Sequence, residues 1–172
     1  MRINWIIFRE IDDNGGFDSL ISNFVEETMD PITKQHIFVN HEMDSTFVHG
    51  KIHRRKYLVN NNIRFNDSLT IHEDSYFNIL AQNCSKNVKY CQVPFYLWKW
   101  RDESVCRHDP KYILKTYNNM LDSNTSLINE FKRRRMYENA RRFVAFMIFD
   151  SYYTMCKPDW LNQENQEYRH KT

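Results

Sequence analysis

The chain has 172 residues, of which 41% are hydrophobic and 27% charged, and its formal net charge is +2. This length fits one domain with a real core, and the near balance of charges argues against a nucleic-acid binder that works through its overall field. No apolar run approaches the roughly 18 residues that a membrane-spanning helix needs, and charge appears too early in the chain for a signal peptide.

The four cysteines show neither a Cys-x-x-Cys pair nor the spacing of zinc ligands. We therefore expect free thiols and a cytoplasmic protein. The cysteines are Cys84, Cys91, Cys106 and Cys156.

The start of the chain carries helix, turn and strand signals in that order. Residues 3–11 have the apolar spacing of a short amphipathic helix, and a turn with paired glycines follows. Residues 17–27 are predicted to form a strand, whereas residues 28–45 are polar and are predicted to be mostly loop. The expected anchors of the strand are Phe17, Leu20 and Phe24.

The middle of the chain is predicted to continue with short elements. A strand is expected through Phe47 and Val48, and the basic run after it leads into a short helix that ends near residues 60–62. Residues 63–65 indicate a brief strand. A helix then begins with Glu73 and Asp74, with Ser68 or Thr70 as its expected cap.

The last part of the chain changes from strand to helix. Residues 86–101 have the strongest strand signal, interrupted by Pro94 as at an edge or a bulge. After a loop, the pattern from Pro110 is helical. It predicts a helix over residues 111–124 and a long helix or a helical pair over residues 126–157.

Three blocks in succession carry a family resemblance. They read "HGKIHRRKYLVNNNIRFNDSL", "IHEDSYFNILAQN" and "VPFYLWKWRDESVCRHD". Their order resembles the second half of family 2 glycosyltransferases, where a Gly-Lys-x-x-Arg-Arg segment and a short strand precede a Glu-Asp motif that opens a helix. In that family a strand ending in Tyr or Trp is followed by an Arg and a Ser, here Arg101 and Ser104. The resemblance covers roughly residues 17 to 109.

The resemblance implies an α/β fold with a partial GT-A domain, the Rossmann-like nucleotide-diphospho-sugar transferase fold. Residues 1–109 are expected to form its acceptor-side part, and residues 110–172 a helical C-terminal extension. The family's donor-binding half and its metal-binding Asp-x-Asp motif have no counterpart here, and the early Asp12 and Asp13 are not assigned that role. An upstream segment or a partner chain is expected to supply the donor half.

The Glu-Asp motif is the expected catalytic centre. Inverting glycosyl transfer needs a base that takes the proton of the acceptor hydroxyl, and the resemblance implies Asp74 in that role with Glu73 in support. A helix N-terminus favours an ionised carboxylate. The simpler alternative is that both carboxylates only occupy the first turn of a surface helix. His72 either contacts the sugar or acceptor or, more simply, neighbours the cap.

Further substrate contacts are expected from the first and third blocks. Lys51, Arg54 and Arg55 either face the diphosphate of a nucleotide sugar or form an exposed basic turn. Gly50 either lets backbone approach a ligand or relieves a bend. Trp100 either stacks on a sugar ring or, like Trp98, packs in the core.

A divalent metal, Mn or Mg, is expected from the family, with His108 as a candidate ligand of an incomplete site. The C-terminal "FKRRRMYENARRF" stripe either contacts an anionic membrane or RNA or, more simply, is the solvated face of a packed helix. The aromatic residues that follow are expected in the core. They are Phe143, Phe146, Phe149, Tyr152 and Tyr153.

The sequence thus favours an enzyme that moves a sugar from a nucleotide sugar to a hydroxyl acceptor, with no nucleic-acid partner. The alternative is a non-catalytic interaction or accessory protein that retains a glycosyltransferase-like remnant.

Overall fold

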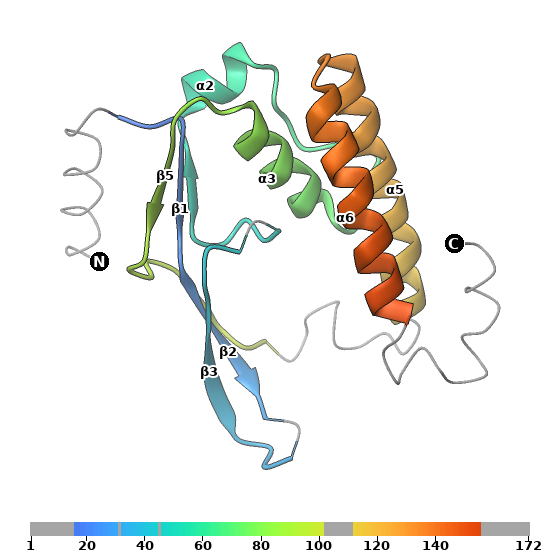
Figure 1. The fold of residues 1–172 in the computed structure, drawn as a ribbon. Helices are drawn as coiled ribbons and strands as arrows, with labels where there is room; N and C mark the ends of the chain where they lie inside the picture. The colour runs from blue at the N-terminus through green and yellow to red at the C-terminus, as the bar shows by residue number, and fades with distance from the viewer. Residues whose placement is uncertain (1–15, 31, 45, 102–111, 156–172) are drawn as a thin grey trace. The chain divides into compact units, whose positions relative to one another are not determined.

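The computed structural model describes residues 16–30, 32–44, 46–101 and 112–155 (Figure 1). These residues have mixed α/β structure, with two small three-stranded sheets and four helices. Contacts divide the chain into two compact units, residues 1–66 with 74–104 and residues 67–73 with 105–172. The predicted helix over residues 3–11, the candidate ligand His108 and two of the cysteines lie outside the described residues.

The first unit contains a sheet with the strand order β4-β1-β5. Its central strand, β1 (Ser19–Ser22), pairs antiparallel with β4 (Lys51–His53) and parallel with β5 (Val88–Cys91). Leu20 stands opposite Ile52, so both point to the same face. On that face the buried Phe17, Leu20 and Cys91 form a core cluster against which Ile52 and Phe95 pack.

The second sheet of this unit has the order β3-β2-β6. Here β2 (Phe24–Met29) pairs antiparallel with β3 (His36–His41) and parallel with β6 (Leu97–Trp98). The prediction of a mostly looped segment at residues 28–45 therefore missed β3, a strand whose first five residues are exposed and which has no buried face to mark it.

Both predicted long strands are divided in two. The signal over residues 17–27 becomes β1 and β2, which meet at Asn23, and its three expected anchors are all buried as predicted. The signal over residues 86–101 becomes β5 and β6, with Pro94 in the gap between them. The chain passes from the first sheet to the second at Asn23. Its backbone N donates to Cys91 O at 3.2 Å, and its side-chain Oδ1 accepts from Met43 N at 3.1 Å.

The strand expected at Phe47 and Val48 is wrong, and the reason is a side-chain cap. Asp44 Oδ1 accepts hydrogen bonds from Thr46 N at 2.7 Å, Thr46 Oγ1 at 2.6 Å and Phe47 N at 3.3 Å. A short acidic side chain that satisfies the following amides replaces a strand ladder with a turn. The strand β4 begins only after Gly50.

Two helices belong to this region. The predicted short helix is confirmed as α2 (Arg55–Asn60), and the helix opened by the Glu-Asp motif is α3 (Glu73–Cys84). The expected brief strand at residues 63–65 is not formed. Apolar packing holds that segment instead, because Ile63 is buried and Phe65 stacks on Phe77 at 4.2 Å.

The helix α3 packs on the face of the first sheet opposite the core cluster. The ring of Phe77 lies edge-on to His53 of β4 at 5.6 Å. The hydroxyl of Tyr57 in α2 donates to Ala81 O at 2.5 Å. These contacts fix where the first turn of α3 lies along β4.

The second unit is a helical hairpin of α5 (Tyr112–Arg133) and α6 (Tyr137–Met155). Its helices run side by side in Figure 1, and Phe131 meets Phe143 edge-on at 6.2 Å. The predicted end of the first helix at residue 124 is wrong, because α5 continues to Arg133. The turn lies around Arg135, whose φ is +60°, and Met136 N donates back to Phe131 O at 2.8 Å.

The aromatic residues of α6 do not all belong to the core. Phe143 is buried as predicted, but Phe146 is 49% exposed and Phe149 68% exposed. For Tyr152 and Tyr153, the structure describes only the helical backbone of α6. None of the described helices combines the length and the apolar character needed to cross a membrane.

Candidate active site at the start of helix α3

Asp74 lies in the first turn of α3 and is half-buried. Burial raises the pKa of its carboxyl, while a hydrogen bond from the Val48 backbone and the charge of Lys51 act to lower it. Amide groups at a helix N-terminus add a partial positive charge that favours the carboxylate. The result is a carboxyl group that accepts a proton more readily than an exposed aspartate does.

Lys51 is the cation of this site. It is half-buried at the start of β4, and its Nζ donates to the carbonyl oxygens of Phe47 and His49. Burial lowers the pKa of Lys51 to about 8, although the charges of Asp44 and Asp74 raise it. Lys51 is therefore mainly protonated at neutral pH, and the charges of two carboxylates act on it.

Asp44 is the third charged residue of the site and caps the turn that precedes Lys51. Burial acts to raise the pKa of Asp44, but hydrogen bonds from Thr46 and Phe47 together with the charge of Lys51 outweigh it and leave the pKa below its ordinary value. Asp44 is thus held ionised as a turn cap, whereas Asp74 is biased toward binding a proton. The two carboxylates near one lysine have different environments and suit different tasks.

The turn of residues 46–50 is tied to α3 at two points one helical turn apart. Asp74 accepts from the Val48 amide, and Asn78 Nδ2 donates to Thr46 O at 3.2 Å. Asn78 is fully buried, and its side chain also hydrogen-bonds with the His53 ring, which opposes the lowering of the His53 pKa by burial. Positions four residues apart lie on one helix face, so α3 sets the distance between Asp74 and this turn.

The side chains of the same turn join a cluster of aromatic and histidine rings. His49 stacks on Tyr96 at 4.7 Å and lies tilted against Trp98 at 4.8 Å. His41 stacks on Phe24 at 4.4 Å and contacts Glu26 Oε2 through Nε2 at 2.8 Å. Burial lowers the pKa of His49. The rings of the cluster belong to Phe24, His41, Phe47, His49, Tyr96 and Trp98.

Gly50 and Lys51 lie with Asp74, whereas the two arginines do not. Gly50 has φ +68°, and a Cβ there would stand 2.8 Å from the backbone oxygen of Ser22. Because Gly50 has no side chain, the backbone of β1 can lie close to it. Arg54 Nε donates to Phe17 O at 2.6 Å, at the far end of β4, and its guanidinium lies 5.2 Å from the Phe17 ring centre. Arg55 is exposed in the first turn of α2.

The remaining expected residues have other surroundings. Trp100 N donates to Glu27 Oε2 at 3.3 Å, and its ring lies edge-on to His36 at 6.0 Å in the second sheet. His72 directly precedes α3 with φ +63°, and its carbonyl accepts from Ser123 Oγ at 3.0 Å. Glu73 is the first residue of α3.

The sequence pattern did not indicate three residues of this site, which are Asp44, Asn78 and His49. A short-range signal existed for Asp44, because an aspartate two residues before a threonine is typical of a side-chain-capped turn. Asn78 also lies four residues after the expected base, on the same helix face. His49 carried no such signal, since its contacts come from strands that are distant along the chain.

The described residues contain no group of three His, Cys, Asp or Glu side chains that could hold a metal ion. The divalent metal therefore stays a prediction of the resemblance. Cys91 is a buried free thiol, as predicted. No family model, curated protein or solved structure matches this chain.

Proposed function

We propose that this chain provides the acceptor side of an inverting glycosyltransferase with a GT-A-type fold, with Asp74 as the general base. One observation carries the proposal. Asp74 stands at a helix N-terminus, half-buried and near Lys51, with a raised pKa. A carboxylate with these properties can accept a proton at neutral pH and still remain ionised between turnovers.

In the proposed reaction, the acceptor hydroxyl oxygen attacks the anomeric carbon of a nucleotide sugar. Its proton moves to the Asp74 carboxylate, and the bond from the anomeric carbon to the diphosphate oxygen breaks, so that the nucleoside diphosphate leaves with the electron pair. Lys51 keeps Asp74 ionised before the attack and is itself mainly protonated. The donor is held by a partner chain that supplies the donor-binding half.

The test separates donor binding from transfer. Nucleotide sugars are titrated calorimetrically with manganese into the chain, alone and with the product of any neighbouring gene, and transfer is followed in the format that binds. We expect Asp74→Asn to abolish transfer and leave donor binding nearly intact, because only the proton acceptor is lost. Asp67→Asn, a change at an exposed aspartate, is the matched control and should leave both unchanged. Absence of donor binding in every format contradicts the proposal.

The second candidate is a non-catalytic interaction protein with the same fold remnant. It is favoured by one contact, the hydrogen bond from the Val48 amide to Asp74, which gives this carboxylate a structural task in holding the turn. In that case Asp74→Asn should reduce donor or partner binding and thermal stability together, with no selective loss of a chemical step.

A further inference from the structure

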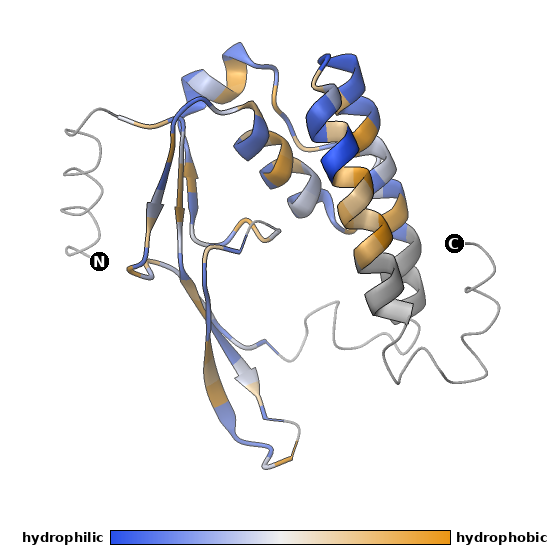
Figure 2. Cartoon of the chain, viewed as in Figure 1, coloured by the Kyte–Doolittle hydropathy of each residue, from blue (hydrophilic) through white to orange (hydrophobic). Residues whose placement is uncertain are grey.

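The exposed side of α6 changes character along the helix. Its first two turns present charged side chains, and its next two turns present apolar ones, as Figure 2 shows by the change from blue to orange along α6. Val144 is 39% exposed, Ile148 67% and Phe149 68%. Arg141, Val144 and Ile148 follow each other at helical spacing, so basic and apolar groups share one exposed stripe.

A dense group of cations lies next to this stripe. Between Glu130 and Phe149 the chain has six basic residues and two acidic ones. Arg141 and Arg142 approach Glu138 only to 3.7 and 3.6 Å, and all three side chains are at least 60% exposed, so these pairs are weak. The basic residues are Lys132, Arg133, Arg134, Arg135, Arg141 and Arg142, of which Arg133 and Arg134 are paired with Glu130.

We propose that the exposed face of α6, together with the basic α5–α6 turn, binds the surface of an anionic phospholipid bilayer. Cations next to exposed apolar side chains complement a membrane surface, where phosphate and serine headgroups lie directly above the acyl chains. RNA would use the arginines but would leave Ile148 and Phe149 in water. An apolar partner helix would use those two residues but has no need of the surrounding cations.

A helix bound in this way lies in the plane of the interface and does not cross the membrane. Ile148 and Phe149 enter the boundary between headgroups and acyl chains. Arg141 and Arg142 lie about two turns away, within reach of the phosphates, and the aliphatic part of an arginine side chain packs on the apolar side of that boundary. The proposal does not depend on sugar transfer, since no residue of the candidate active site belongs to α6.

Vesicle co-sedimentation of the full chain tests the proposal. We expect binding to phosphatidylcholine vesicles that contain phosphatidylserine, weaker binding as salt increases, and little binding to phosphatidylcholine alone. Arg141→Gln combined with Arg142→Gln should weaken binding about thirtyfold, because each lipid-facing cation contributes about one kcal/mol. Ile148→Asp combined with Phe149→Asp should abolish measurable binding to these vesicles.

Matched controls come from the exposed part of α2. Lys56→Glu reverses an exposed charge and Val59→Asp places a carboxylate at a side chain that is 65% exposed, so neither should change vesicle binding. Circular dichroism confirms that each variant retains its helices. Retained transfer or donor binding in the α6 variants separates this proposal from the proposed enzyme.

Several results would overturn the membrane proposal. One is equal binding to both kinds of vesicle, and another is equal loss of binding in the α2 controls. A third is no vesicle binding combined with tight binding of a labelled single-stranded RNA. A fourth is self-association in sedimentation velocity that disappears in the Ile148→Asp and Phe149→Asp variant, which would assign the face to a second copy of the chain.

Discussion

At the scale of single residues, the pair of Asp74 and Lys51 determines what the candidate site can do. Each lies in a partly desolvated position that disfavours its own charge, and each favours the charge of the other. Because the pKa of Asp74 is raised in the folded chain, its contribution to stability is present when it is protonated at low pH. That contribution is lost as the pH rises through the folded-state pKa.

Replacing Lys51 by Met should raise the pKa of Asp74 further, because the nearby charge that lowers it is removed. Carboxyl ¹³C NMR titration measures this shift directly and needs no activity. Lys56→Met, at an exposed lysine of α2, should leave the titration of Asp74 unchanged. An unchanged Asp74 titration in Lys51→Met would show that the two charges do not interact.

Gly50 makes a second prediction at this scale. Gly50→Ala should destabilise the chain by about 1–3 kcal/mol, because φ +68° is strained for alanine and the new Cβ would stand 2.8 Å from the Ser22 oxygen. Urea unfolding measures the loss. Gly50→Asn tolerates the positive φ better but makes the same close approach, so an equal loss in both variants assigns the cost to contact with β1.

At the scale of secondary structure, the elements with a buried face were the predictable ones. The helix α2, the start of α3 and the anchors of β1 and β2 agree with the apolar pattern of the sequence. The strand β3 was missed because its side chains are exposed on both faces and its place depends on pairing with β2. The turn at residues 46–50 was read as a strand because Asp44 competes with the ladder.

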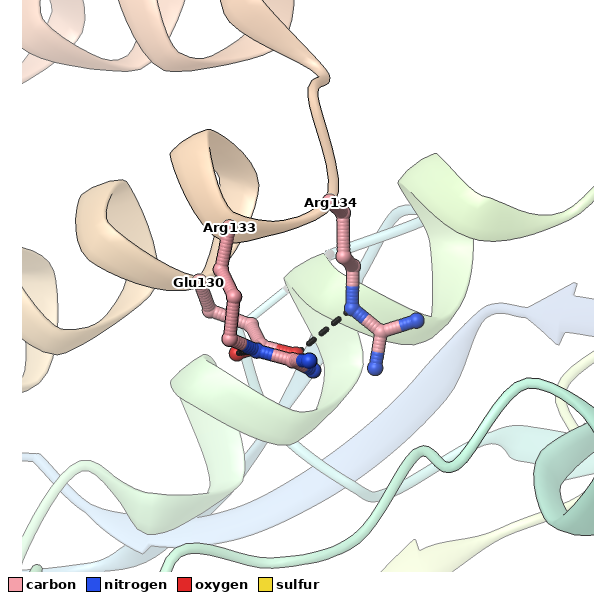
Figure 3. Close-up of polar contacts among 3 residues, drawn as sticks. All are labelled: Glu130, Arg133 and Arg134. Carbon is pink, nitrogen blue, oxygen red and sulfur yellow. Dashed lines mark hydrogen bonds and ion pairs between the residues drawn. The ribbon is translucent and has the colours of Figure 1, made fainter.

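One acidic residue, Glu130, binds two arginines at the C-terminal end of α5. Glu130 forms hydrogen bonds with Arg133 at 2.6 and 2.7 Å and with Arg134 at 2.6 Å (Figure 3). The hydrogen bond from Arg133 lowers the pKa of Glu130, and Arg134 adds to it although burial opposes them. A lowered pKa contributes stability that is present above the ordinary glutamate range and lost as the pH falls through the folded-state value.

Glu130→Gln should therefore cost about 1 kcal/mol of unfolding free energy at neutral pH, and the difference from the unmodified chain should shrink in acid. Glu138→Gln is the matched control, because its contacts with Arg141 and Arg142 are longer and exposed, and its effect should be near zero. Chemical denaturation at several pH values measures both. Equal effects of the two substitutions would contradict the assignment.

At the scale of the whole molecule, the order of the chain and its compact units differ. Residues 67–73 group with the helical hairpin although they stand within the first half of the sequence. Ser123 Oγ donates to His72 O at 3.0 Å, and Thr70 Oγ1 approaches Asn119 Oδ1 to 3.1 Å. Such contacts join residues about fifty positions apart, so no local pattern could have indicated them. The position of the predicted boundary at residues 109 and 110 lies outside the described ranges.

Ser123→Ala should cost about 1 kcal/mol, because a buried hydroxyl donor to His72 is removed. Hydrogen exchange of the amides around residues 70–73 should become faster. Thr125→Ala, at an exposed position of the same helix, should change neither quantity. Unchanged exchange in Ser123→Ala would show that other contacts fix this segment.

The strand β3 has a consequence for the handling of the protein. It is the edge of its sheet within the described residues, it reads "HIFVNH", and it contains neither lysine nor proline. Phe38 is 65% exposed on it. Natural sheets use lysine and proline on edge strands to prevent unwanted pairing with other chains. Because β3 has neither residue, it is a template for aggregation at high concentration. A lysine in place of Val39 is the substitution that we expect to improve solubility most directly.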